Sequence, residues 1–531
     1  IARLVFEQND GRVLTYKQVC HAFGKTNMGQ KRAIYQTLVS MAEGGEIQEL
    51  EPGRFVRGGL SKERLEGRFD YRAGRASFIP DDPEIDTLPL SDRALANALH
   101  GDRVAVSFVR TRRGEYKRVQ VVEILERREA TYVGRLQISR GYAFFVSLNR
   151  ELRQDVFIPE DKTMGATGHD KVVVRITDWD RKSKNPRGEV IDILGKAGDN
   201  STEMHAILAE FGLPYSYPEA VEKAAEALSA EITEEELAQR EDFRGVLTCT
   251  IDPRDAKDFD DALSFRTLPG GYEVGVHIAD VSHYVQPGSI IDDEAYKRAT
   301  SVYLVDRTIP MLPERLSNFL CSLRPDEDKY AYSCIFSLDE DAQLRSARIA
   351  RTVIRSQRRF TYEEAQEIIE TGKGDHAEAI LTLHRLAQKL RARRFEVGSI
   401  AFDRPEVRFE LDEDGKPLSV YIKESKPAHQ LIEEFMLLAN RTVAERIAEP
   451  TRKDISPALR LGRGGKPAFV YRIHEAPDEE KLRGLSDYVR RFGYKLKVEG
   501  GSSVIAKSLN ALLADIKGKP EEDMLTMLAI R

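Results

Sequence analysis

The chain has few cysteines and no long hydrophobic run, and both scarcities narrow the class of protein. Its cysteines are 229, 72 and 13 residues apart, which fits neither a disulfide framework nor a zinc pattern: Cys20, Cys249, Cys321 and Cys334. No uninterrupted apolar stretch approaches the roughly 18 residues of a membrane span, and no segment has the pattern of a signal peptide. We therefore expect a cytoplasmic chain with reduced thiols and no membrane partner. Because it opens with Ile1 and not with methionine, we expect residues to be missing before it.

The composition is that of a folded, multidomain chain with unevenly distributed charge. At about 150 residues per domain, 531 residues correspond to three or four units. The net charge is −6, yet residues 102–118 hold six basic and two acidic residues, whereas residues 219–242 hold nine acidic and two basic ones. An acidic total is therefore compatible with a basic groove for nucleic acid, although two solvated surfaces explain the same pattern.

Residues 1–57 predict a small winged-helix domain. Helical patterns occupy "LTYKQVCHAF" and "QKRAIYQTLVSMAEGG", and "EIQELEPGRFV" has two alternating runs around Pro52-Gly53. Two helices followed by a hairpin is the order of a winged helix, a module that commonly contacts nucleic acid. Packing on a neighbouring domain is the alternative role.

The chain then repeats itself with a displacement of 67 residues, which relates three pairs: Gly67 and Gly134, Gly74 and Gly141, and Phe78 and Phe145. Each copy ends in a similar run, and the corresponding aspartates are Asp102 and Asp170. Short alternating strands broken by Gly and Pro predict two five-stranded OB-fold barrels of the cold-shock kind, over residues 58–128 and 129–197.

Such barrels bind single strands by stacking bases on exposed aromatic side chains over a basic surface. The candidates for stacking are Phe69, Phe78, Tyr142, Phe144 and Phe145. An aromatic residue in a strand often belongs to the core instead. Alternation of side chains along a strand points only one of Phe144 and Phe145 outward.

Residues 198–531 predict a mixed α/β domain that begins with an acidic helical connector from Asp199 to Asp242. A capping-box pattern runs from Thr233 to Glu236 in this connector. Further helices are expected in "TYEEAQEIIE", "AEAILTLHRLAQKLRARRF" and "HQLIEEFMLLANRTVAERI", and a loop rich in Arg, Lys and Gly is expected over residues 451–466.

The most informative segment is "GVLTCTIDPRDAKDFDDALSF", in which carboxylates follow a predicted strand. An apolar run from Val246 to Ile251 ends at Asp252, and three aspartates follow at +6, +8 and +9: Asp258, Asp260 and Asp261. Four carboxylates within ten residues repel one another unless cations share the site. Aspartates without His or Cys favour an oxygen-seeking ion such as Mg²⁺, and one or two such ions suit phosphodiester hydrolysis. A solvated acidic loop is the alternative.

The same segment resembles a known family. "TIDPRDAKDFDDAL" resembles the signature of the RNB catalytic domain of the RNase II and RNase R family. Further family blocks are similar, and in the same order, to "YEVGVHIADVSHYV", "SVYLVDRTIPMLPERLSNFLCSL" and "YRIHEAPDEEKL". The resemblance covers about residues 199–531. Tandem cold-shock barrels also fit the family, and an N-terminal winged helix makes the chain look more like the RNase R branch.

The resemblance implies a processive, hydrolytic 3′→5′ exoribonuclease that uses Mg²⁺ and releases nucleoside 5′-monophosphates. By motif position, the catalytic acids and metal-binding residues would be Asp252, Asp258, Asp260 and Asp261. Among these acids, the first and the last would be direct metal ligands, and Asp260 would be essential.

The resemblance also implies contacts to the 3′-terminal nucleotide. Tyr303 in "SVYLVDR" and Phe402 in "GSIAFDRPE" would stack on its base, and Glu433 in "LIEEFMLLAN" would hold its sugar. For the last two residues, a core aromatic and an exposed helix acid are the alternative explanations. The family places a catalytic Arg in a "SPIRRY"-like element, followed by an OB-type barrel, beyond the position of Arg531. We therefore expect the RNB domain to be C-terminally incomplete and this chain to be a weak catalyst.

Three functions compete. The first is an exoribonuclease that acts as a monomer on single-stranded 3′ ends, including those of structured RNA. The second is an RNA-binding or remodelling protein with an inert RNB domain. The third is a DNA-directed nuclease with the same metal chemistry. The intact acids favour a nuclease, because an inert domain has no reason to keep four mutually repelling carboxylates, and the RNA-specific 2′-hydroxyl weighs against DNA.

Overall fold

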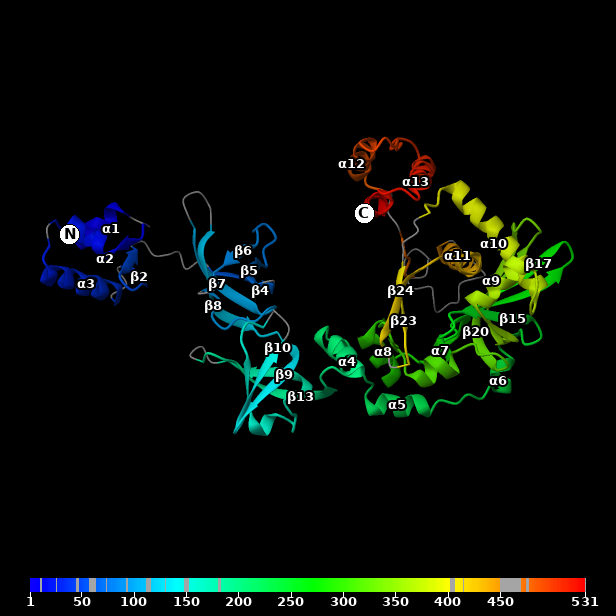
Figure 1. Cartoon of the computed structure of the whole chain (residues 1–531), viewed down its shortest axis with the longest axis horizontal. Helices are drawn as coiled ribbons and strands as arrows, with labels where there is room; N and C mark the ends of the chain where they lie inside the picture. Colours follow the sequence, from blue (N-terminus) through cyan, green and yellow to red (C-terminus); the bar gives the residue numbers. More distant parts are fainter. Residues whose placement is uncertain are drawn as a thin grey trace, which may run out of the picture. The chain divides into compact units, whose positions relative to one another are not determined.

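Helices and strands of the computed structural model divide into two units, Ile1–Tyr215 and Ser216–Arg531 (Figure 1). The structure describes the whole chain except residues 10–11, 25, 44–46, 57–63, 73, 92–93, 111–115, 129, 148–151, 180–182, 402–405, 414, 449–468, 474–476 and 531. Within the described residues, no helix combines the length and the apolar character that crossing a membrane requires. The predicted loop at 451–466 and the predicted site residue Phe402 both lie outside the described residues.

The first 56 residues form a small helical module with a three-stranded sheet of order β1-β3-β2. Its elements are α1 (Ala2–Gln8), β1 (Leu14–Thr15), α2 (Tyr16–Ala22), α3 (Met28–Glu43), β2 (Gln48–Glu51) and β3 (Arg54–Val56). Phe6, Leu38 and Phe55 are fully buried in its core. The two predicted helices and the hairpin are present, and α1 and β1 are additional elements. Assignment of this module as a winged helix stays a prediction.

The predicted repeat forms two five-stranded β structures. The first has strand order β6-β5-β4-β7-β8: β4 (Arg64–Arg72), β5 (Arg75–Pro80), β6 (Leu88–Leu90), β7 (Arg103–Arg110) and β8 (Tyr116–Glu126). The second is a closed barrel of order β10-β11-β13-β12-β9: β9 (Thr131–Ser139), β10 (Tyr142–Ser147), β11 (Val156–Pro159), β12 (Asp170–Asp178) and β13 (Arg187–Lys196), with the short 3₁₀ helix η2 (Glu160–Lys162). The cold-shock and OB-fold expectation is confirmed, and the domain boundaries stay a prediction.

Close backbone packing explains why the repeat keeps its glycines. A Cβ atom on Gly67 would lie 2.2 Å from the carbonyl oxygen of Ile79, and one on Gly134 would lie 2.2 Å from that of Val146. In both copies the ring of the buried repeat phenylalanine also lies 2.8 Å from that position. Any side chain would therefore push the first two strands of the copy apart.

Turns at equivalent positions are also built alike in the two copies. Gly74 and Gly141 have φ of +77° and +81°, the left-handed conformation that glycine adopts without strain in a tight turn. In the later turn, the carboxylate of Asp102 accepts a hydrogen bond from the Leu99 amide at 2.8 Å. The carboxylate of Asp170 accepts one from the Thr167 amide at 2.8 Å. The sequence repeat is thus a structural repeat.

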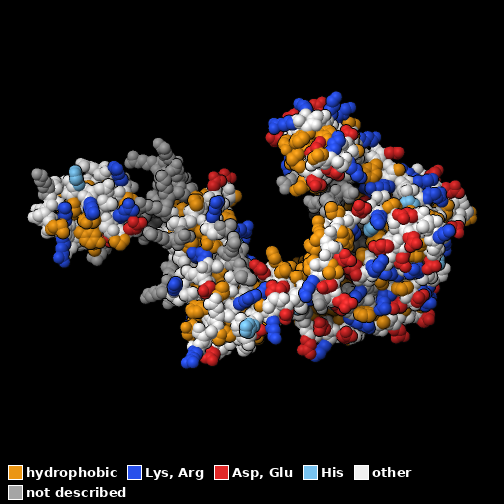
Figure 2. Space-filling view, in the orientation of Figure 1, with side chains coloured by type: hydrophobic (Ala, Val, Ile, Leu, Met, Phe, Trp, Pro, Cys, Tyr) orange, Lys and Arg blue, Asp and Glu red, His pale blue; other side chains and the backbone are white. Residues whose placement is uncertain are grey.

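The acidic connector divides between the two units. Its first helix, α4 (Asn200–Glu210), buries Ala206 and Ala209 against Val133 and Val173 of the second barrel. For this reason the first unit extends to Tyr215. The short helices α5 (Glu219–Glu226) and α6 (Glu234–Leu237) belong to the second unit, and Thr233 caps α6 by accepting from the Glu236 amide as predicted. Figure 2 shows acidic and basic side chains interspersed over the visible face of this unit.

A seven-stranded sheet of order β14-β21-β20-β17-β16-β15-β22 is the framework of the second unit. Its strands are β14 (Glu241–Asp242), β15 (Leu247–Asp252), β16 (Asp261–Leu268), β17 (Gly271–Ala279), β20 (Asp328–Leu338), β21 (Leu344–Arg355) and β22 (Arg358–Thr361). Between β17 and β20 lie α7 (Val281–Tyr284), α8 (Ile290–Arg298), the β18–β19 hairpin (Val302–Tyr303 and Thr308–Ile309) and the π-helix η3 (Arg315–Leu320). β14 and β22 pair in parallel with their neighbours, whereas the central strands are antiparallel.

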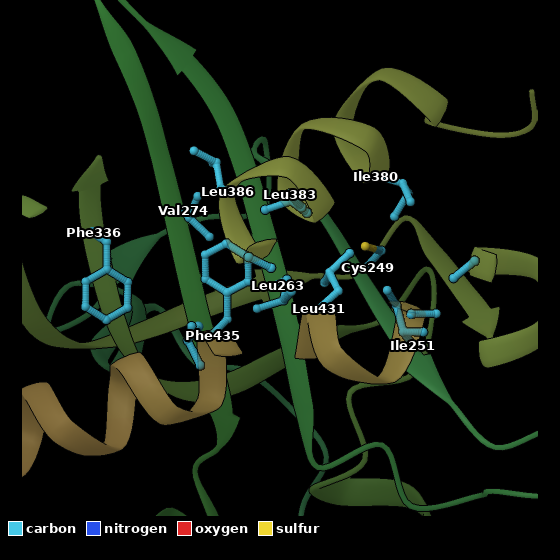
Figure 3. Packing of buried hydrophobic residues seen from close by; sticks show 14 of the residues in the cluster. Cys249, Ile251, Leu263, Val274, Phe336, Ile380, Leu383, Leu386, Leu431 and Phe435 are labelled. Atoms are coloured by element: carbon cyan, nitrogen blue, oxygen red, sulfur yellow. The ribbon is translucent and has the colours of Figure 1, made fainter. Parts of the chain in front are cut away.

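Three predicted helices cover one face of this sheet: α9 (Tyr362–Thr371), α10 (Ala377–Val397) and α11 (Pro427–Ala448). Figure 3 shows Leu383 and Leu386 of α10 and Phe435 of α11 packed over strand residues such as Val274 and Phe336. Ile251 and Leu263, at the ends of the acid segment, belong to the same core. The strands that carry the aspartates are therefore held by a large apolar interface.

The remaining elements follow this core in the chain. The β23–β24 hairpin (Glu406–Leu411 and Pro417–Lys423) connects α10 to α11. Helices α12 (Glu479–Arg490), α13 (Ser502–Ile516) and α14 (Glu522–Ile530) form a small cluster of their own around Val489, Leu512 and Leu525.

Gly134→Ala tests the close packing of the repeat. Overpacking of this kind costs about 1–3 kcal/mol, so amides of β9 and β10 should exchange hydrogen about 10- to 100-fold faster in the full chain. Gly168→Ala is the matched control, because its Cβ would meet only the Leu136 carbonyl oxygen at 3.6 Å. Equal exchange rates for the two variants would contradict the packing argument.

Candidate active site

Strand ends bring the predicted acids to one edge of the sheet. β15 ends at Asp252, and its antiparallel neighbour β16 begins at Asp261, so both carboxylates lie at the same end of adjacent strands. Asp258 and Asp260 lie in the loop that joins the two strands. On the other side of β15, the parallel strand β22 places Thr361 beside Asp252. The local sequence pattern therefore places all four aspartates at one edge.

Burial raises the pKa of two of these carboxylates, Asp252 and Asp261. Asp252 is only 9% exposed, and one of its carboxylate oxygens has no hydrogen-bond partner among the described residues. Burial raises its pKa to about 7, and the charge of Asp261 adds to the rise. Burial also raises the pKa of Asp261 to about 6, with a further contribution from Asp260. Ionising this pair without a cation is thus unfavourable.

Asp260 and Tyr303 lie on the more open side of the cluster. Asp260 is solvent-accessible, yet surrounding protein atoms and then the charge of Asp258 still raise its pKa. The Tyr303 ring is 72% exposed at the end of β18. Partial burial raises its pKa, and the charges of Asp258 and Asp260 raise it further. The stacking role of Tyr303 stays a prediction.

Tyr362 is a candidate site residue that the sequence reasoning missed. Burial raises the pKa of Tyr362 to about 12, and Asp261 and Asp252 add to the rise, which places its ring beside the buried pair. The ring stacks on His429 of α11 with centroids 4.1 Å apart and an interplanar angle of 11°. The available signal was the position of Tyr362, directly after a strand that runs parallel to β15.

Glu433 lies one helical turn after His429 on α11, so both side chains project from the same side of the helix. Its exposed carboxylate is 3.1 Å from the Arg394 guanidinium of α10. The same Arg394 also binds the buried Glu434. Glu433 is therefore held in place by an ion pair, and its predicted contact with a sugar stays a prediction.

Arg359 fixes the beginning of the acid loop, which the sequence reasoning did not foresee. Its guanidinium donates hydrogen bonds to the carbonyl oxygens of Pro253 at 2.6 Å and Arg254 at 2.9 Å. It lies 5.5 Å from the centroid of the Phe259 ring. Its positive charge also opposes the rise in the pKa of Asp252. A residue on β22 thus stabilises the turn that carries the acids.

The side chains at this edge are carboxylates, the type of donor that a hard cation prefers, but they do not converge on a single position. Within the described ranges, no three His, Cys, Asp or Glu side chains converge as a metal site. The set nevertheless consists of carboxylate oxygens, and Asp252 offers a buried oxygen without a partner. Oxygen donors with concentrated negative charge are what Mg²⁺ and similar ions prefer. The role of Asp252 and Asp261 as direct metal ligands stays a prediction.

Most of the aromatic residues that were predicted to stack on bases lie inside the two β structures. Phe69, Phe78 and Phe145 are fully buried, because strand alternation turns them into the barrel cores, so their assignment as stacking residues was wrong. Tyr142 is 40% exposed and Phe144 is half-buried on the outer face of β10.

Phe157 of β11 joins this outer face and was missed. Its ring stacks on that of Tyr142 with centroids 5.8 Å apart, and the Arg187 guanidinium lies 5.6 Å from the Phe157 centroid. Stacked aromatic rings beside a guanidinium are typical of surfaces that bind single-stranded nucleic acid. At the positions of β5 equivalent to Tyr142 and Phe144, the first copy has Arg75 and Ser77.

Comparisons with known proteins match both parts of the chain. A model of the RNB domain matches residues 240–531, and a model of the cold shock domain matches residues 144–218. The chain is 37% identical to Ribonuclease R of Aquifex aeolicus over 82% of this chain and 60% of that protein. It is 33% identical to Ribonuclease R of Thermotoga maritima over 98% of this chain and 72% of that protein. The chain thus spans 60 to 72% of the length of these relatives.

A solved structure of Mycoplasma genitalium RNase R in complex with ribose-methylated single-stranded RNA superposes with a TM-score of 0.75. The two chains are 25% identical, and the match covers 88% of this chain and 72% of the other. The likeness therefore extends over both units and includes their order along the chain.

Asp252→Asn tests the electrostatics of the buried pair. The pKa of Asp252 is about 7 in the folded chain and about 3.9 in an unfolded one. Between these values the folded state holds a proton that the unfolded state has released, so the free energy of unfolding falls as pH rises through this window. Each pKa unit corresponds to about 1.4 kcal/mol. In EDTA at about pH 8, the variant should therefore unfold at a higher temperature than the parent.

Thermal unfolding across pH measures this difference, and the exposed Asp255→Asn should follow the parent curve. Added Mg²⁺ should raise the unfolding temperature of the parent more than that of Asp252→Asn. A variant that is less stable than the parent at high pH without metal would contradict the assignment of an unfavourable buried charge.

Proposed function

The chain belongs to the ribonuclease R family of RNB-domain proteins, and on that basis we propose that it is a hydrolytic 3′→5′ exoribonuclease. It would release nucleoside 5′-monophosphates processively from single-stranded 3′ ends, including those that extend from structured RNA. The observation that carries the proposal is the buried, unpartnered carboxylate oxygen of Asp252 next to Asp261 at one sheet edge.

The acids at this edge would hold Mg²⁺, as one or two ions, through Asp252, Asp258, Asp260 and Asp261. When bound, a divalent ion supplies Lewis-acid chemistry toward a phosphodiester and its attacking water. Asp252 and Asp261 would bind from the buried side, where apolar packing fixes their strands. Asp260, on the open side, is the acid best placed to meet the substrate and orient water. Arg359 keeps the loop from spreading as charge accumulates.

Substrate contacts would come from both units. Tyr303, exposed beside Asp258 and Asp260, would stack on the terminal base and place its phosphodiester at the acids. Glu433 would bind the terminal sugar, and Phe402 keeps its predicted stacking role. On the second barrel, Tyr142 and Phe157 would stack on bases farther along the strand. The protein would act as a cytoplasmic monomer.

An RNA-binding protein with an inert RNB domain is less well supported, because all four acids are present and burial raises the pKa of Asp252 and Asp261. A DNA-directed nuclease would share the metal chemistry. Incubation with 5′-labelled RNA and DNA oligomers, with and without Mg²⁺, separates the three functions. We expect RNA alone to be shortened from its 3′ end, and only with Mg²⁺.

Asp260→Asn should abolish hydrolysis while leaving RNA affinity nearly unchanged. The acid acts at the reacting phosphate, whereas affinity comes from stacking and phosphate contacts spread along the strand. Asp255→Asn is the matched control, because this exposed acid lies in the same turn outside the cluster. Gel assays of hydrolysis and titrations of RNA binding measure the two properties. Hydrolysis by Asp260→Asn at the parent rate would refute the role of the cluster.

Tyr303→Ala should lengthen the final undegraded fragment. Stacking of a base on an aromatic ring contributes about 1–3 kcal/mol to binding. Without this contribution, an RNA must be longer to stay bound, so degradation should stop at a longer fragment. Tyr296→Ala is the control, since this tyrosine is 87% exposed on α8. Product lengths on a sequencing gel give the answer. Unchanged end products for Tyr303→Ala would rule out a role for its ring in holding the 3′ end.

A further inference from the structure

The acid loop, which joins Asp252 at the end of β15 to Asp261 at the start of β16, is hydrogen-bonded to the segment that follows the π-helix η3. The hydroxyl of Ser322 donates a hydrogen bond to the carbonyl oxygen of Lys257 at 2.9 Å and accepts one from the amide of Phe259 at 3.0 Å. These two main-chain groups lie on either side of Asp258 in the chain. One hydroxyl therefore fixes the backbone on both sides of a predicted catalytic acid.

A third bond and close packing make this attachment rigid. The Leu323 amide donates to the carbonyl oxygen of Phe259 at 2.8 Å, next to the Ser322 contact. Phe259, Cys321 and Leu323 are buried in one hydrophobic cluster, and Ser322 is completely buried. Solvent does not reach the Ser322 hydroxyl, so water is not available to take its place in binding both groups of the loop.

The loop needs such an attachment because its own charges tend to open it. Asp255, Asp258 and Asp260 lie within six residues and are joined to two buried carboxylates at the strand ends. Arg359 binds the beginning of the loop at Pro253 and Arg254, and the Ala279 amide binds the carbonyl oxygen of Asp260 at 3.0 Å. Ser322 holds the part between these two attachments.

We propose that Ser322 is a positioning residue, which holds the Asp258 carboxylate in register with the other acids through the main chain of Lys257 and Phe259. The inference rests on the proposed function of the cluster as a metal site. Ser322 itself touches neither substrate nor metal. Its hydroxyl acts on the geometry of the donors, so its loss should weaken metal binding and slow hydrolysis more than it lowers stability.

Ser322→Ala in the full chain tests this role, with Ser333→Ala as the matched control. Ser333 is equally buried in β20, and its hydroxyl binds the side chains of His277 and Thr352 and not the acid loop. Mn²⁺ binding, measured from the electron paramagnetic resonance of the free ion, reports on the donors without requiring turnover. Hydrolysis of a 5′-labelled RNA at saturating metal gives kcat and KM, and thermal unfolding gives the folded fraction.

We expect Ser322→Ala to raise the Kd for Mn²⁺ about tenfold, because the variant loses both hydrogen bonds of the hydroxyl to the loop. We expect its kcat to fall about 10- to 100-fold with little change in KM, because misplaced catalytic groups slow the chemical step. Ser333→Ala should lose stability but keep the parent Kd and kcat. A folded Ser322→Ala protein with parent values for Mn²⁺ binding and kcat would overturn the proposal.

Failure of the proposed function would give a different pattern. If the parent hydrolysed no RNA with any divalent ion, the exoribonuclease assignment would fail. The Mn²⁺ measurement would still decide the role of Ser322, because weakened binding in Ser322→Ala alone supports positioning and equal binding in both variants excludes it.

Discussion

Carboxylates that share a site repel one another, and burial strengthens that repulsion because little solvent is present to screen it. The second unit is organised around this constraint at the edge where β15 and β16 meet. Apolar packing of α10 and α11 holds the two strands, so Asp252 and Asp261 cannot move apart to lower their energy. Arg359 and Ser322 then hold the loop between them from two sides. A bound cation would relieve this repulsion, as the proposed function requires.

The first unit contains two copies of one β structure, and their outer faces differ although their cores are built alike. Both copies keep the same glycine contact and the same buried phenylalanine, because these determine how closely the first two strands approach. Outward positions are free of that requirement, and two of them differ: β10 has Tyr142 and Phe144 where β5 has Arg75 and Ser77. Core positions thus preserve the barrel, whereas outer positions determine what each barrel binds.

Features encoded within a short stretch of chain could be predicted from the sequence. Helices α9, α10 and α11 follow from their apolar periodicity, and the acid cluster follows from four aspartates within one turn after a strand. Tyr362, Arg359 and Ser322 come to this edge from distant elements, so no local pattern reveals them. The phenylalanines Phe69, Phe78 and Phe145 were wrong for a related reason. Composition suggests stacking, but the side of the strand on which a ring lies is set by the register of the barrel.

The glycine and phenylalanine positions that the two barrel copies share have a consequence for how the chain folds. Strand β4 of one copy and strand β9 of the other offer the same glycine, at the same place, to a following strand with the same buried ring. Before either barrel closes, β4 can therefore pair with β10, or β9 with β5. Mispairing of this kind is a known hazard of tandem domains. Sequence differences between the copies at other positions act against this exchange. Divergence of the outer faces thus serves correct assembly as well as recognition.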